Sequence, residues 1–325
     1  MTAGTPEDLQ SPVVDLTSTE DEGLWLDTAF TWLVRIFAFC TIAVMGWMAV
    51  VIFKQAFPAI QAFGLGFLWS QEWDVGALVF GALPYIYGTL VTSTIALLIA
   101  IPIGLSVALV TSENFLPAWV RSPIAFLIEL IAAIPSVIIG LWGIFVLIPF
   151  LLPIGVWLHQ VFGWFPLFST EPFGPGMLPA GVILAIMILP TMAAISREVL
   201  IAVPGELRSA SGALGATRWE TIFRVILPAG LSGILGAATL ALGRALGETM
   251  AVTMVIGNSQ LISASLLDPA SSIPSLLANQ FAEALDDLHV GALMYLALIL
   301  FVLTLLVNIV AVLMVRFLSP TLRAS

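Results

Sequence analysis

Two ionisable side chains of opposite charge, Arg244 and Glu248, interrupt a long apolar segment in the second half of the sequence. An arginine at the centre of a membrane-spanning helix costs about 2.5–3.5 kcal/mol, so it normally faces the protein interior or an aqueous path. Their spacing of four predicts that both lie on one helix face, within reach of each other. Two interpretations stay open. The pair either fixes helix packing, or lines an anion path in which Glu248 holds Arg244 in place.

A second motif lies in a polar loop that precedes this segment. A short helix is expected over Glu206–Leu214, and Gly215 is suited to end it in a left-handed turn. Thr217 and Glu220 have the spacing of a capping box, which starts a new helix. Arg224 lies one turn beyond Glu220, where an ion pair is expected. The loop therefore predicts a short helix, a tight turn and a helix that enters the membrane.

The elements that position these residues are membrane helices. Of the 325 residues, 60% are hydrophobic and 9% are charged, whereas soluble domains carry about 25% charged residues. Six apolar segments reach or exceed the length of about 20 residues that a spanning helix needs. They are 30–57, 83–110, 124–152, 177–196, 223–256 and 290–317. The expected fold is all-α with six transmembrane helices, and Pro102, Pro135 and Pro228 are expected to kink or interrupt them.

Charge is unevenly distributed along the chain. Residues 1–27 hold seven acidic side chains and no basic one, so they are expected to form an acidic, disordered cytoplasmic leader. Residues 28–325 are expected to form one six-helix domain, with its core at 83–317. Eight arginines fall on the side of the amino terminus and only Lys54 on the other, which predicts cytoplasmic termini by the positive-inside rule. The external loops are 58–82, 153–176 and 257–289.

Composition argues against several classes of site. Lys54, the only lysine, is not part of a Gly-Lys-Ser/Thr phosphate-binding loop, so any ATP and Mg that drive this protein are expected on another chain. One cysteine, Cys40, and two distant histidines, His159 and His289, make a metal site improbable. No basic stripe suggests nucleic-acid binding. Paired acids or nucleophile–base sets that would indicate an enzyme are not evident.

Several strings resemble one transporter family. GRALGETMAVTMVIGN (Gly243–Asn258) is similar to the fifth-span signature of the PstC permease family of bacterial phosphate ABC importers, as are 129–143 and 189–200. Residues 88–109 fit the second span of the general binding-protein-dependent permease fold, which is MetI-like. The resemblance covers about Thr31 to Leu322. It implies a type I importer permease that forms half of a phosphate pathway, with a transport role for Arg244 and Glu248.

The polar loop 197–228 resembles the EAA loop of the same family, which forms a coupling helix that docks on the ATP-binding subunit. The resemblance implies a coupling role for Glu206, Ser209, Ala210, Gly215, Ala216, Thr217 and Arg218. Ser209 departs from the pattern, because it stands where the family usually has the glutamate of its EAA triplet. Glu206 lies one turn upstream.

The resemblance also implies partners and a location. They are a second permease (PstA-like), two copies of an ATP-binding subunit (PstB-like), an extracytoplasmic phosphate-binding protein (PstS-like) and the lipid bilayer of the bacterial inner (plasma) membrane. Two alternatives remain open. One is a permease for another oxyanion such as sulfate, and the other is an ion-coupled secondary transporter with Arg244 and Glu248 as its relay.

Weaker expectations concern other polar residues. The Thr191 hydroxyl either lines a pathway or, as spanning helices more often show, bonds its own backbone. Glu129 either pairs with the second permease or lies near the membrane interface. Asp268, Asp286 and His289 are expected on the solvated surface of an external loop.

Overall fold

A computed structural model of the protein describes residues 20–113 and 115–318. Its contacts divide the chain into residues 1–51 and 52–325, which are described separately. In the first unit, the described residues belong to helix α1 (Glu20–Phe63), which continues into the second unit. Residues 20–27, expected within the leader, are therefore helical. Residues 1–19 lie outside the described part of the chain.

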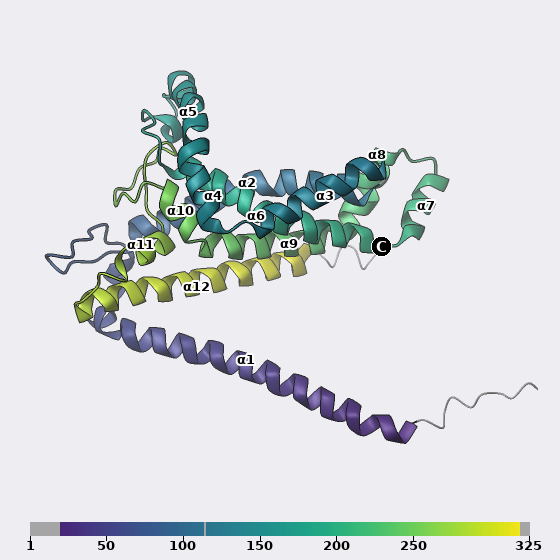
Figure 1. The fold of residues 1–325 in the computed structure, drawn as a ribbon, viewed down its shortest axis with the longest axis horizontal. Coiled ribbons are helices and arrows are strands. Elements are labelled where there is room, and N and C mark those ends of the chain that lie inside the picture. The colour runs from purple at the N-terminus through teal and green to yellow at the C-terminus, as the bar shows by residue number, and fades with distance from the viewer. Residues whose placement is uncertain (1–19, 114, 319–325) are drawn as a thin grey trace, which may run out of the picture. The chain divides into compact units, whose positions relative to one another are not determined.

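The second unit is a helical assembly in which the long helices run lengthwise (Figure 1). The long helices are α2 (Leu83–Ser112), α6 (Met177–Ala202), α9 (Leu227–Gly247) and α12 (Asp287–Leu318). The shorter ones are α3 (Ala118–Ala133), α4 (Ser136–Trp142), α5 (Ile148–Phe162), α7 (Gly205–Ala213), α8 (Arg218–Thr221), α10 (Met250–Val255) and α11 (Ile273–Gln280). Helices α7 and α8 lie at one end of this unit, and α10 and α11 at the other. Among the described residues, six helical stretches are long and apolar enough to cross a membrane, as expected.

The third expected segment, 124–152, is divided at Pro135. Helix α3 ends at Ala133, and Ile134 and Pro135 adopt extended ψ angles of 128° and 138° before α4 begins at Ser136. Proline disfavours helical backbone at the preceding residue and cannot donate to the helix, so the chain turns there. The interruption expected at Pro135 is confirmed. The membrane-length stretch consequently runs over 136–162 rather than from residue 124.

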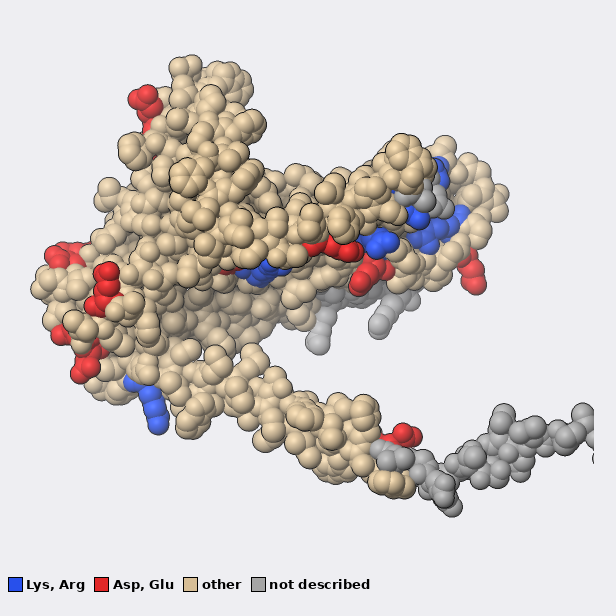
Figure 2. Space-filling view, in the orientation of Figure 1, with Lys and Arg blue, Asp and Glu red and all other residues tan. Residues whose placement is uncertain are grey.

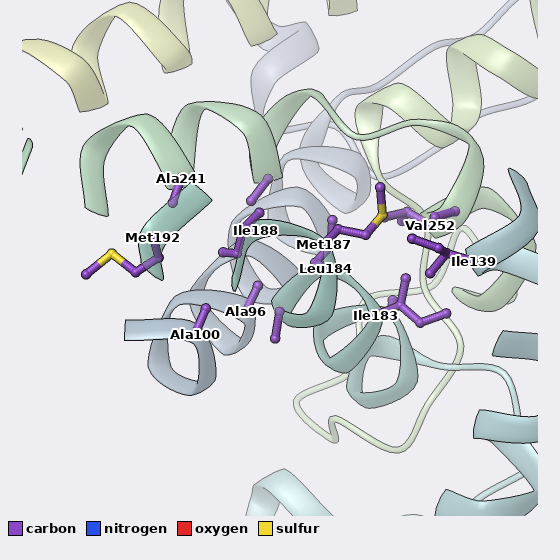
Figure 3. Packing of buried hydrophobic residues seen from close by; sticks show 14 of the residues in the cluster. Ala96, Ala100, Ile139, Ile183, Leu184, Met187, Ile188, Met192, Ala241 and Val252 are labelled. Carbon is purple, nitrogen blue, oxygen red and sulfur yellow. The ribbon is translucent and has the colours of Figure 1, made fainter. Parts of the chain in front are cut away.

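Helix α6 packs between α2 and α9 through small and aliphatic side chains (Figure 3). At Gly181, a Cβ atom would lie only 2.5 Å from the Ile95 side chain on α2. Small residues allow such close backbone approach, which favours helix association inside a membrane. Ala96, Ala100 and Ala241 are likewise buried along these contacts. The three helices therefore form a tight framework.

A second buried cluster, rich in aromatic residues, lies at the α11 end. The rings of Phe67 and Tyr295 stack with centroids 4.6 Å apart, and Phe80 stacks on His289 at 5.3 Å. His289 is only 4% exposed, so the expectation that it belongs to the solvated surface is wrong. The Gln280 side-chain oxygen accepts hydrogen bonds from Trp73 Nε1 at 2.9 Å and His289 Nε2 at 3.1 Å. The Phe80 ring covers the His289 imidazole, and the Gln280 side-chain oxygen accepts the hydrogen bond of its Nε2.

Gln280→Leu is expected to destabilise the protein by about 1–2 kcal/mol, because two buried donors lose their acceptor. The measurement is thermal unfolding of the purified chain in detergent. Gln160→Leu, at an exposed position on α5, is the matched control. Equal melting temperatures for the two variants would contradict the assigned hydrogen bonds.

Candidate functional site

Arg244 lies in the last turn of α9, and its guanidinium contacts α6. Its Nη1 donates a hydrogen bond of 3.2 Å to Thr191 Oγ1. A guanidinium carries five N–H donors in a planar fork, so this contact orients the group and leaves donor capacity for a ligand. Arg244 is exposed and Thr191 half-buried. The Thr191 hydroxyl thus accepts a hydrogen bond between helices, which is neither of the two uses expected from the sequence.

Glu248 does not share the α9 face with Arg244. Helix α9 ends at Gly247, and Glu248 is extended with φ −70° and ψ 125° before α10 begins at Met250. Glycine is a poor helix former, and the Thr249 hydroxyl bonds the Gly247 carbonyl at 3.2 Å, which competes with the helical pattern. The expected i, i+4 pairing is therefore wrong. An ion pair does join Arg208 and Glu113, whereas none joins the described side chains of Arg244 and Glu248.

The break after Gly247 has a consequence for function. Non-helical backbone at membrane depth is tolerated only where protein buries it or where it lines a water-filled cavity. Discontinuous helices of this kind form substrate sites in many transporters. The half-buried Glu248 and the exposed Gly247 lie at the break, one turn beyond the Arg244 guanidinium. The geometry thus argues against a structural ion pair of Arg244 and Glu248, and their role in a pathway stays a prediction.

Further charged groups lie on α3 and in the C-terminal part of α6. Glu129, Arg197 and Glu198 line a cavity of about 90 Å³ together with residues of α2. The Arg197 Nε atom is buried and has no hydrogen-bond partner among the described residues. Sequence reasoning assigned no site to Arg197 or Glu198, although their position directly after a spanning segment was a signal. Glu129, whose partner was left open, lines the same cavity as these two residues.

The polar loop has the expected form. Helix α7 spans Gly205–Ala213, and Gly215 has a φ of +83°, which a residue with a side chain rarely adopts. Leu214, at the end of the helix, is 89% exposed. Glu206, Ser209 and Ala210 are exposed on α7, Ala216 is half-buried, and Thr217 and Arg218 are exposed where α8 begins. The loop thus exposes an apolar tip and a polar helix.

The capping box at the start of α8 is confirmed. Thr217 Oγ1 accepts from the Glu220 amide at 3.4 Å, and the Glu220 carboxylate accepts from the Thr217 amide at 2.8 Å. The ion pair expected between Glu220 and Arg224 is not formed in this described segment. The carboxylate is turned toward Thr217, and the π-helical turn Ile222–Ile226 changes the helical register.

Thr217→Ala is expected to open the first turn of α8, at a cost of about 1 kcal/mol for the lost cap. Hydrogen–deuterium exchange at residues 218–221 should accelerate about fivefold, the equivalent of that energy. Thr217→Ser, which keeps the hydroxyl, is the control and should exchange like the wild type. Slow exchange in Thr217→Ala would show that the capping box does not stabilise this turn.

Charged side chains gather mainly toward the two ends of the second unit, and a few lie near its middle (Figure 2). Arginines gather at the α7–α8 end together with acidic side chains, whereas the charged side chains at the α11 end are mainly acidic. Residues of the first group are Arg208, Arg218 and Arg224. Residues of the second are Asp268, Glu283, Asp286 and Asp287. The two ends therefore differ in their electrostatic character.

Residues 100–324 match the family described as "Binding-protein-dependent transport system inner membrane component". The chain is 44% identical over 291 residues to the phosphate transport system permease protein PstC of Mesorhizobium japonicum, covering 88% of each chain. It is 41% identical over 302 residues to the PstC protein of Haemophilus influenzae, covering 91% of this chain and 95% of the relative.

Solved structures show the same fold. A chain of a bacterial ABC transporter that imports the acidic polysaccharide alginate superposes with a TM-score of 0.56 at 20% identity, covering 92% of this chain and all of the other. A chain of the inward-facing MetNI methionine ABC transporter gives a TM-score of 0.53 at 20% identity, covering 74% of this chain and 94% of the other.

Proposed function

This chain belongs to the family of binding-protein-dependent transport system inner membrane components, within it to the PstC permeases, and on that premise we propose its function. It is the permease subunit of an ATP-driven phosphate importer and forms half of the phosphate pathway. The structural observation that carries the proposal is the Arg244 guanidinium, oriented by Thr191 beside the break in the fifth span. No covalent chemistry is assigned to this chain.

Arg244 offers the passing phosphate a transient contact. A guanidinium matches the geometry of phosphate oxygens and can donate two parallel hydrogen bonds. Glu248 lies at the helix break rather than on the guanidinium, so it does not neutralise Arg244 directly. Its carboxylate tempers the affinity for the anion through repulsion, because a contact that is too strong would trap the phosphate.

The loop 197–228 couples this chain to ATP hydrolysis. Helix α7 and the exposed Leu214 fit a groove of an ATP-binding subunit, with Gly215 setting the turn. Ser209 cannot form the salt bridge of a glutamate at its position, so Glu206 supplies the nearest carboxylate. ATP and Mg are bound by that partner. Closure of the two ATPase copies shifts the coupling helices and turns the pathway outward, and hydrolysis resets it.

The remaining partners follow from the two charged ends. By the positive-inside rule, the arginine-rich α7–α8 end faces the cytoplasm. Both termini then lie on the cytoplasmic side of a bacterial inner membrane. The acidic α11 end and residues 58–82 then face outward, where a phosphate-loaded binding protein docks. A second permease completes the pathway. Selectivity rests largely on the binding protein.

The test is reconstitution in proteoliposomes with the ATPase, the second permease and the binding protein. Phosphate-loaded binding protein is expected to stimulate ATP hydrolysis and phosphate uptake only when this chain is present. Stimulation by sulfate and not by phosphate would leave the importer fold unchanged and identify sulfate, not phosphate, as the substrate. Uptake that an uncoupler abolishes but that is indifferent to ATP would contradict the importer function.

A further inference from the structure

The guanidinium of Arg208 on α7 joins three helices at one point. Its Nε and Nη2 donate to a single carboxylate oxygen of Glu113, at 3.3 and 3.1 Å. Its Nη2 also donates to the Leu200 carbonyl at 2.7 Å, and its Nη1 to the Val203 carbonyl at 2.6 Å. Glu113 is the residue that caps α2, and Leu200 and Val203 lie at the end of α6. One side chain of α7 thus hydrogen-bonds to the C-terminal ends of both α2 and α6.

These contacts matter because α7 has almost no apolar attachment. Within α7 only Ser211 is buried, and most of its other side chains are exposed. Ser211 Oγ lies 2.9 Å from Thr221 Oγ1 of α8. Arg208 and Ser211 are three residues apart and therefore share a helix face. Two polar anchors consequently attach α7 to the rest of the second unit.

The two anchors lead to different spans. Arg208 attaches α7 to α2 and α6, whereas Ser211 attaches it through α8 to the start of α9. Helix α6 carries Thr191 and α9 carries Arg244, the two residues that meet in the candidate pathway at 3.2 Å. A displacement of α7 therefore acts on both helices that form the pathway contact.

We propose that Arg208 is the positioning residue that transmits movement of α7 into α2 and α6, with Glu113 holding its guanidinium in place. This inference rests on the proposed coupling function of the loop. Arginine suits the role because its planar fork can donate to a carboxylate and to two carbonyls at once. The side chains of Arg208 and Glu113 are 27% and 15% exposed, so water competes only weakly for these bonds. The positive charge also complements the carbonyl end of α6.

The test compares Arg208→Gln with the wild type in the fully reconstituted transporter, measuring the phosphate imported per ATP hydrolysed. Arg208→Gln is expected to copurify with the ATPase and to hydrolyse ATP at a rate within about twofold of the wild type. Its transport per ATP should fall about tenfold, as expected when charged hydrogen bonds that carry the coupling are lost. Arg208→Lys, which keeps the charge but not the fork, should retain an intermediate ratio.

Glu113→Gln and Lys54→Gln complete the design. Glu113→Gln should lower transport per ATP about threefold, and the double variant with Arg208→Gln should be no worse than Arg208→Gln alone, since both act through one contact. Lys54→Gln removes an exposed positive charge outside the loop 197–228 and should keep the wild-type ratio.

Three outcomes would overturn the proposal. They are a wild-type ratio in Arg208→Gln, an equal loss of ATP hydrolysis and uptake, or a wild-type ratio in Glu113→Gln if Arg208→Gln does not assemble. Failure of the importer function itself would be seen separately. In that case the wild-type complex would show no phosphate-stimulated ATP hydrolysis.

Discussion

Replacing Arg244 by glutamine is expected to reduce phosphate uptake by about 10–100-fold, because one charged donor contributes roughly 1.5–3 kcal/mol to an anion contact. Glutamine keeps an amide that can reach toward Thr191 but has no positive charge. Arg244 is exposed and makes its contact across helices at 3.2 Å, so the change removes little packing. The variant complex should therefore assemble normally. Uptake of labelled phosphate in proteoliposomes measures the effect.

Two companion variants separate charge from geometry at this site. Arg244→Lys keeps the charge without the planar fork and should retain part of the uptake. Thr191→Val keeps the shape of the side chain and removes the oxygen that orients the guanidinium, so a loss smaller than that of Arg244→Gln is expected. Wild-type uptake by an assembled Arg244→Gln complex would remove Arg244 from the pathway.

Gly88→Val is expected to destabilise the protein by about 3 kcal/mol or more, the upper range for overpacking a core. A Cβ atom at Gly88 would lie 2.1 Å from the Ser271 carbonyl oxygen, which belongs to the backbone and cannot rotate away. The hydroxyl of the next residue, Thr89, accepts a hydrogen bond from the Ile273 amide at 2.9 Å. The segment before α11 is therefore held against α2. A larger side chain must separate the two segments.

Gly236→Val on α9 is the matched control, because a Cβ atom at that position meets nothing within 4 Å. Its effect on the isolated chain should stay within about 0.5 kcal/mol. Thermal unfolding in detergent measures both variants. A melting temperature of Gly88→Val close to that of Gly236→Val would show that α2 and the segment before α11 are not in close contact.

Local sequence patterns determined the features that depend on neighbouring residues. The turn at Gly215 and the capping box of Thr217 and Glu220 form as expected, because each needs only one to three residues of sequence separation. The interruption at Pro135 was likewise readable, since proline acts on its own backbone. Apolar length alone sufficed to predict six membrane-length helical stretches.

Periodicity misplaced the partners of charged residues. The spacing of Arg244 and Glu248 predicted a shared helix face, but α9 ends between them, at Gly247. The spacing of Glu220 and Arg224 predicted a pair, but the Glu220 carboxylate bonds Thr217 instead. In the first case, Gly247 and the Thr249 hydroxyl favour a non-helical backbone. In the second case, the helix cap at Thr217 engages the carboxylate.

The sequence by itself therefore determined the class of protein and its six apolar stretches, and it singled out the loop 197–228 and the residues Arg244 and Glu248 as predicted sites. Only the tertiary structure decided that Arg244 meets Thr191, that Arg208 joins Glu113, and that His289 is buried. Arg244 and Thr191 are 53 positions apart in the sequence, and Arg208 and Glu113 are 95 positions apart. His289 is covered by Phe80, which belongs to a distant segment. Hydrophobicity and helix signals act over a few residues, whereas a polar side chain finds its partner only after the helices have packed.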